Sequence, residues 1–205
     1  MFFRDNQCNT YRELSCNSQY SVTKKNEMNK VKVNSHMPGL IGFLLLLGSF
    51  VAQAQTCNIA IPLNSPDSRY QNNGDGTVID LYTGLMWQRC TAGRSGVDCT
   101  SGNATRFTWE EALQYPSDIN ASGGYAGMND WRLPNAKELD SLVEYSCINP
   151  AINATFFPET SDFLYWSSSP YYSLRAWSIN FAAGGATWYG ARTGNNRVRL
   201  VRAGQ

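Results

Sequence analysis

The last third of the chain alternates large apolar residues with small or polar ones. In residues 176–181 the large side chains Trp177, Ile179 and Phe181 occupy every second position. This period of two is typical of a β-strand with one buried face. Similar patterns predict further strands at residues 165–169, 187–189 and 197–202.

Two segments in the middle of the chain carry helix signals. Thr108 is followed three residues later by Glu111, the pattern of a capping box, and we expect this helix to continue only as far as Pro116. Asn135 is the expected N-cap of a second helix, which should end near Cys147. Its apolar face consists of Leu139, Leu142 and Val143.

Two shorter strands, at residues 77–80 and 84–88, are expected after a turn cluster at residues 72–76. With the two helices and the strand-rich last third, they indicate an α+β domain with short antiparallel strands. We expect Arg132 beside a carboxylate or backbone carbonyl groups. The predicted core contains Trp131, Leu133, Leu139, Leu142, Trp166, Trp177, Ile179 and Leu200.

The apolar run at residues 39–51 is too short to span a bilayer comfortably, since a spanning helix needs about 20 residues. Basic residues precede this run, and Ala52-Gln53-Ala54 follows as a small-x-small cleavage site. We therefore interpret residues 28–54 as a signal peptide and residues 1–27 as an unstructured, mis-called upstream extension. Residues 55–205 then form one mature domain without a membrane span. The alternative is a membrane anchor with residues 1–27 in the cytoplasm.

The mature domain is slightly acidic. Residues 1–54 hold 6 of the 17 basic and 3 of the 16 acidic residues, which leaves 11 − 13 = −2 for residues 55–205. A net charge of this sign gives no electrostatic support for a nucleic-acid partner. We expect the protein to be secreted, periplasmic or displayed on the cell surface.

Four cysteines remain after residue 54. Export favours two disulfides, and the short separation of Cys90 and Cys99 favours a local loop closure, which leaves Cys57 to pair with Cys147. A zinc site is the competing interpretation. The cysteines have neither a CxxC spacing nor an accompanying histidine to support it.

The chemistry that the mature domain can perform is restricted. His36, the one histidine, lies in the predicted signal peptide, so histidine-based nucleophile activation and metal catalysis are excluded. We therefore predict that the domain is not an enzyme. The alternative is a carbohydrate-active enzyme that uses carboxylates alone, and the available pairs are Glu110 with Glu111 and Glu138 with Asp140. Those residues lie at helix starts, where capping also explains them.

A candidate calcium site consists of Asn73, Asp75 and Asp80, whose oxygen atoms surround a glycine-containing turn. The competing interpretation is a hairpin turn. No other cofactor is expected.

Arginines gather in the last third, where they suggest a surface for an anionic partner. In residues 197–202, alternation places Val198 and Leu200 toward the core and Arg197 and Arg199 away from it. Arg192 is expected beside Arg197 across a turn. The candidate ligand-binding residues are thus Arg192, Arg197 and Arg199, with Tyr171 and Trp188 for stacking on sugars. In the competing interpretation, carboxylates from residues 110–162 neutralise these arginines.

Five motifs occur in an order that resembles a known family. They are residues 73–88, Trp109-x-x-Ala112, residues 130–139 beginning Asp-Trp-Arg-Leu-Pro, Tyr165-Trp166-Ser167-Ser168-Ser169 and Arg199-Leu200-Val201-Arg202. Together they resemble the C-terminal domain family of the Legionella collagen-like adhesin. The resemblance implies a bacterial adhesion module whose partner is an extracellular glycan or surface protein. The named adhesin binds sulfated glycosaminoglycans and trimerises, which implies an anionic glycan and a homo-oligomer here, although this chain has no collagen repeat.

Residues 130–134 are also similar to the Trp-Arg-Leu-Pro helix entry of formylglycine-generating sulfatase modifiers. Those enzymes have the C-type lectin-like fold, so this similarity implies the same fold for residues 55–205. Their catalytic cysteines have no counterpart in this chain, where the last cysteine is Cys147. The similarity therefore extends to the fold and not to the activity.

Overall fold

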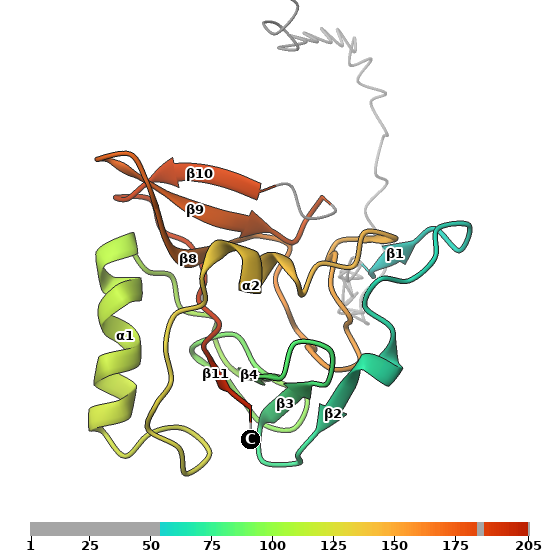
Figure 1. Cartoon of the computed structure of the whole chain (residues 1–205), viewed down its shortest axis with the longest axis horizontal. Coiled ribbons are helices and arrows are strands. Elements are labelled where there is room, and N and C mark those ends of the chain that lie inside the picture. The colour runs from blue at the N-terminus through green and yellow to red at the C-terminus, as the bar shows by residue number, and fades with distance from the viewer. Residues whose placement is uncertain (1–53, 184–186, 205) are drawn as a thin grey trace, which may run out of the picture. The chain divides into compact units, whose positions relative to one another are not determined.

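The hairpin predicted near residue 80 forms the middle of a four-stranded antiparallel sheet. The computed structural model describes residues 54–183 and 187–204 (Figure 1), so the upstream extension and nearly all of the predicted signal peptide lie outside the described residues. A tight turn joins the two central strands, because Asp80 accepts hydrogen bonds from the backbone N–H groups of Tyr82 and Thr83. In spatial order the strands are β11 (Val201–Ala203), β4 (Leu85–Gln88), β3 (Thr77–Asp80) and β2 (Tyr70–Asn72).

A second antiparallel sheet contains three of the four strands predicted in the last third; of the fourth, at residues 197–202, only the end is a strand, as β11 of the first sheet. The spatial order of the second sheet is β10 (Thr187–Ala191), β9 (Arg175–Asn180) and β8 (Leu164–Tyr171). The register between β8 and β9 shifts between Trp166 and Pro170. In Figure 1 these strands lie beside the short helix α2, which packs against β8 and β9.

Both predicted helices begin at the expected caps, but their ends differ from the predictions. Helix α1 (Trp109–Ala121) continues through Pro116, whose ring is buried, because the residues beyond it pack against the core. Helix α2 (Ala136–Asp140) ends well before Cys147. The chain leaves the helix there because Val143 forms an antiparallel bridge with Ile152.

The remaining elements are short. They are β1 (Thr56–Cys57) paired with β7 (Cys147–Ile148), β5 (Arg94–Ser95) paired with β6 (Ser101–Gly102), and the 3-10 turn η1 (Asp67–Arg69). Disulfides join Cys57 to Cys147 and Cys90 to Cys99, the two pairs that the cysteine spacing predicts. The first links β1 to β7 at a register pair, and the second closes the loop that contains β5. With two helices and several antiparallel sheets, the described residues have an α+β fold.

Two hydrophobic clusters form the core. One contains Trp87, Leu139, Tyr165 and Val201, and the other contains Trp109, Trp131, Trp166, Val198 and Leu200. Seven of the eight predicted core residues are buried. The exception is Trp177, which is partly exposed because it lies on the outer face of the second sheet.

The prediction that residues 197–202 alternate between core and surface is wrong. Val198 and Leu200 are buried as expected, but Arg199 and Val201 are fully buried as well. The segment runs between the two hydrophobic clusters, since Val201 belongs to one and Val198 to the other. Both faces are therefore covered, and the period of two no longer separates inside from outside.

Among residues 54–183 and 187–204, no helix combines the length and hydropathy that are needed to cross a bilayer.

Candidate ligand-binding site

Aromatic side chains from all three strands of the second sheet meet on its outer face. The rings of Tyr171 and Tyr189 stack, with centroids 4.2 Å apart and an interplanar angle of 23°. Trp177 meets Tyr171 at 4.8 Å and Tyr189 at 5.7 Å, both edge to face. Trp177 is partly exposed, although its neighbours in sequence, Ala176 and Ser178, are buried. We call Tyr171, Trp177 and Tyr189 the aromatic face.

The aromatic face continues onto the turn between β8 and β9. There Tyr172 contacts Tyr171 with ring centroids 4.6 Å apart, and its side chain is 79% exposed. Tyr189 is 42% exposed, and the guanidinium of Arg175 lies 5.4 Å from its ring centroid. These rings form a partly exposed apolar surface on the second sheet.

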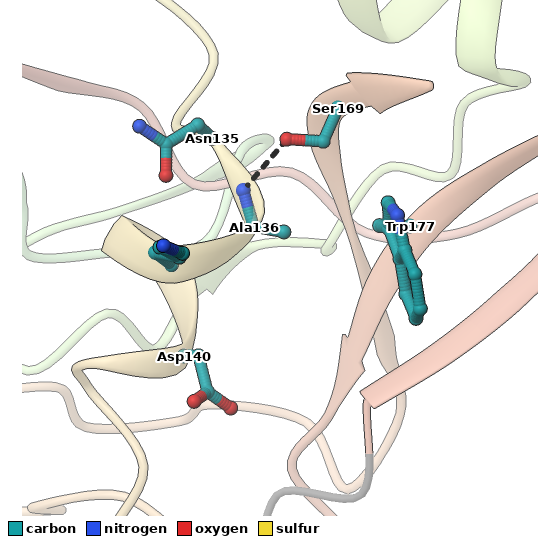
Figure 2. A pocket seen from close by; sticks show the side chains of 6 residues that line it. Asn135, Ala136, Asp140, Ser169 and Trp177 are labelled. Carbon is teal, nitrogen blue, oxygen red and sulfur yellow. Dashed lines mark hydrogen bonds between the residues drawn. The ribbon is translucent and has the colours of Figure 1, made fainter. Parts of the chain in front are cut away.

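A cavity of about 480 Å³ adjoins the aromatic face at Trp177. Figure 2 shows helix α2, which carries Ala136 and Asp140, on one side and the indole of Trp177 on the other. The backbone N–H of Ala136 donates a 3.0 Å hydrogen bond to Ser169 Oγ, which fixes α2 against β8. The lining residues are Asn135, Ala136, Lys137, Asp140, Ser169 and Trp177.

Arg192 supports the turn between β8 and β9. Its guanidinium donates hydrogen bonds to the carbonyl oxygens of Arg175 and Tyr172, at 3.2 and 3.0 Å, and lies 4.2 Å from the ring centroid of Trp109. The predicted position beside Arg197 is wrong, because Arg197 forms a parallel bridge with Tyr165 instead of a hairpin with residue 192. Arg192 thus positions the turn that carries Tyr172.

Arg199 does not lie on the surface of the domain. It is fully buried, donates 2.8 and 2.7 Å hydrogen bonds to Gln88 O and Thr160 Oγ1, and packs over the Phe157 ring. The prediction that it faces away from the core is therefore wrong. Burial lowers the pKa of its guanidinium.

Arg197 is half-buried and bonded to the carbonyl oxygen of Ala104. Its guanidinium and that of Arg106 both lie over the ring of Phe163, at 5.9 and 4.6 Å. Burial, and then the charges of Arg106 and Arg94, lower the pKa of Arg197. We call Arg94, Arg106 and Arg197 the arginine cluster.

The expected neutralisation of the C-terminal arginines by residues 110–162 applies to Arg202, which forms an ion pair with Asp130 at 2.6 Å. In the same region Arg132 pairs with Glu138, as predicted. For Arg192, Arg197 and Arg199 the hydrogen bonds described above go to carbonyl and hydroxyl oxygens instead.

The calcium candidates are engaged in turn and ion-pair contacts. The side-chain amide of Asn73 donates a hydrogen bond to the Thr77 hydroxyl, and that hydroxyl donates one to the carboxylate of Asp75. These two side chains therefore organise one turn. Asp80 accepts from Arg69 Nε and Nη2, at 2.8 and 2.5 Å. Within the part of the chain that the structure describes, no group of three His, Cys, Asp or Glu side chains is arranged to hold a metal ion.

The carboxylates considered for catalysis serve mainly as caps. Glu111 accepts from the backbone N–H and hydroxyl of Thr108, and these hydrogen bonds lower the pKa of Glu111. The hydrogen bond from Arg132 similarly lowers the pKa of Glu138. A general acid needs the opposite shift. Asp140 lines the cavity and accepts a 3.3 Å hydrogen bond from the Tyr145 hydroxyl.

Of the predicted site residues, the structure brings Tyr171 and Arg192 to one region, the turn between β8 and β9. Trp188 belongs to strand β10, but its side chain lies outside the described part. The ligand-binding residues predicted from the sequence do not include Trp177 or Tyr189, and Asp140 was considered only as a catalytic carboxylate. The alternation at residues 176–181 predicts Trp177 in the core with Ile179 and Phe181, but the fold leaves Trp177 partly open to solvent.

The described residues thus define a disulfide-linked α+β domain with an exposed aromatic face and an adjoining cavity. Residues 76–202 match the Lcl C-terminal domain family, and the chain belongs to that family. None of the curated proteins matches the chain.

Proposed function

We propose that the domain is a non-catalytic extracellular binding module that serves in adhesion. The observation that carries this proposal is the aromatic face, whose rings are stacked on the outer side of the second sheet and partly open to solvent. Membership of the Lcl C-terminal domain family supports adhesion, because the family takes its name from a collagen-like adhesin. Two disulfides suit a secreted or cell-surface location.

We further infer that the fold is C-type lectin-like. The support is the helix entry at residues 130–134, which leads into the capped helix α2, and α2 packs against β8 and β9 of the second sheet. A binding role also suits the carboxylates, since Glu111 and Glu138 are held ionised by their caps and Arg132.

A second surface favours an anionic glycan. In the arginine cluster, Arg94 forms an ion pair with Glu159 at 3.3 Å, while the charges of Arg94 and Arg106 disfavour the protonated form of Arg197. A sulfate or carboxylate group placed there would relieve this repulsion and accept charge-assisted hydrogen bonds. Binding at this surface should weaken as salt is added.

A glycan array tests the proposed function. Protein produced from the full chain should bind at least one array glycan, and Tyr171→Ala combined with Tyr189→Ala should reduce that binding about tenfold or more, as expected for aromatic residues at the centre of an interface. Tyr82→Ala is the matched control, since this tyrosine is 86% exposed on the turn between β3 and β4. Binding that the double variant leaves unchanged would reject the aromatic face.

A further inference from the structure

We infer that the cavity between helix α2 and Trp177 binds an uncharged sugar ring, such as a terminal hexose of a glycan. This inference rests on the proposed function and adds the chemical class of the ligand and its position. The ligand would stack on the indole of Trp177 while its hydroxyl groups bond to the polar side chains of α2. The cavity, at about 480 Å³, has the size of a small-molecule site.

The stacking surface is fixed before a ligand arrives. Trp177 is held edge to face by Tyr171 and Tyr189, so the orientation of its indole is set by rings that do not line the cavity. A sugar ring has one face rich in C–H groups, which packs well against an aromatic surface. A pre-oriented indole spares the ligand the entropic cost of ordering a mobile side chain.

Polar groups that suit hydroxyls lie opposite the indole. The carboxylate of Asp140 lines the cavity, and its oxygens are hydrogen-bond acceptors. Lys137, exposed on the same helix, contributes an ammonium donor to the lining. An acceptor and a donor on one wall match the dual hydrogen-bonding capacity of a sugar hydroxyl.

The charge of the lining favours an uncharged ligand. Lys137 and Asp140 carry opposite charges, and they are the two ionisable residues that line the cavity. A quaternary ammonium ligand would meet only one aromatic wall instead of a cage and would be repelled by Lys137. A sulfate or carboxylate group would similarly be repelled by Asp140, and the arginine cluster offers it a better site.

The inference is tested by titrating protein made from the full chain with the methyl glycosides of glucose, galactose, mannose and N-acetylglucosamine. We expect saturation-transfer NMR to detect binding of at least one of them. Trp177→Ala should weaken that binding about tenfold or more, and Asp140→Asn should also weaken it. The affinity should change little between about 50 and 500 mM salt, because an uncharged ligand releases no counterions.

Trp177→Phe accompanies Trp177→Ala. It keeps an aromatic ring, so it should retain part of the binding, and it keeps the test valid if the alanine variant misfolds. Tyr82→Ala is again the control and should bind like the wild type. Choline and glucuronate are the charged probes. Binding of either charged probe, lost in Trp177→Ala, would overturn the assignment to an uncharged sugar, and so would failure of all four glycosides to bind. Loss of array binding in the Tyr171/Tyr189 variant, with no glycoside bound, would leave the proposed function standing and reject this inference alone.

Discussion

At the residue scale, the buried carboxylate of Asp80 is satisfied by dense local hydrogen bonding. Asp80 is fully buried and accepts bonds from Arg69, from the Thr83 hydroxyl and from two backbone N–H groups of its turn. Arg69 is itself only 10% exposed at the side chain. One aspartate therefore ties η1 to the turn between β3 and β4, and its oxygens are engaged by these contacts.

Replacing Asp80 by Asn should destabilise the domain by about 3 kcal/mol, because it leaves Arg69 without its charged partner in a mostly buried position. Burial alone would raise the pKa of Asp80, but the hydrogen bonds from Arg69 and Thr83 lower it overall, below the ordinary 3.8. Its stabilising contribution is thus complete above about pH 4 and is lost as the pH falls through the lower folded value. The free energy of unfolding, measured with urea between pH 2 and 7, should fall less steeply at acidic pH for Asp80→Asn than for the wild type. An identical pH dependence in both proteins would contradict this role.

Arg199 gives a second prediction at this scale. Arg199→Met keeps the volume of the aliphatic stem but removes the donors to Gln88 O and Thr160 Oγ1, leaving buried acceptors unsatisfied. We expect a loss of about 2 to 3 kcal/mol in the free energy of unfolding, measured with denaturant. Binding in the glycan array should be unaffected once the variant is folded. Selective loss of binding in a fully stable variant would mean that Arg199 reaches a ligand.

Residue-level prediction from the sequence succeeded where local chemistry decides the outcome. A carboxylate or carbonyl partner for Arg132 could be inferred, and Glu138, six residues away at a helix start, supplies it. The burial of Arg199 could not, because it depends on the segment running between two clusters whose members come from distant parts of the chain.

At the element scale, the starts of both helices and the existence of β8, β9 and β10 were predictable, whereas element ends and the buried faces depended on tertiary contacts. The caps at Thr108 and Asn135 bond as their sequences indicate. Pro116 was expected to end the first helix, yet the helix extends to Ala121 because Ile119 packs against the core. The cysteine pairs could be predicted from export and the short separation of Cys90 and Cys99. The aromatic face could not, since it needs three strands in register.

The two disulfides should contribute unequally to stability. Cys57–Cys147 closes a loop with a sequence separation of 90, and Cys90–Cys99 one of 9. Loop-closure entropy then gives about 4.6 and 2.6 kcal/mol, respectively. Thermal unfolding should therefore show a lower melting temperature for Cys57→Ala with Cys147→Ala than for Cys90→Ala with Cys99→Ala. The reverse order would indicate that β1 and β7 are loosely attached and that the short loop matters more.

At the scale of the whole molecule, the described domain carries two surfaces of different chemistry. The aromatic face and its cavity suit stacking on sugar rings, and the arginine cluster suits sulfate or carboxylate groups. A glycan that contains both kinds of group could engage either one. The central claim is that the aromatic face makes the primary contact.

Chemical-shift mapping tests this claim most directly. Protein labelled with ¹⁵N is titrated with the glycan that binds most tightly in the array, and shift changes are followed at each backbone amide and indole N–H. We expect the largest changes in β8, β9, β10 and α2, including the indole of Trp177. Changes centred instead on Arg94, Arg106 and Arg197, with the amides of β9 unmoved, would contradict the account.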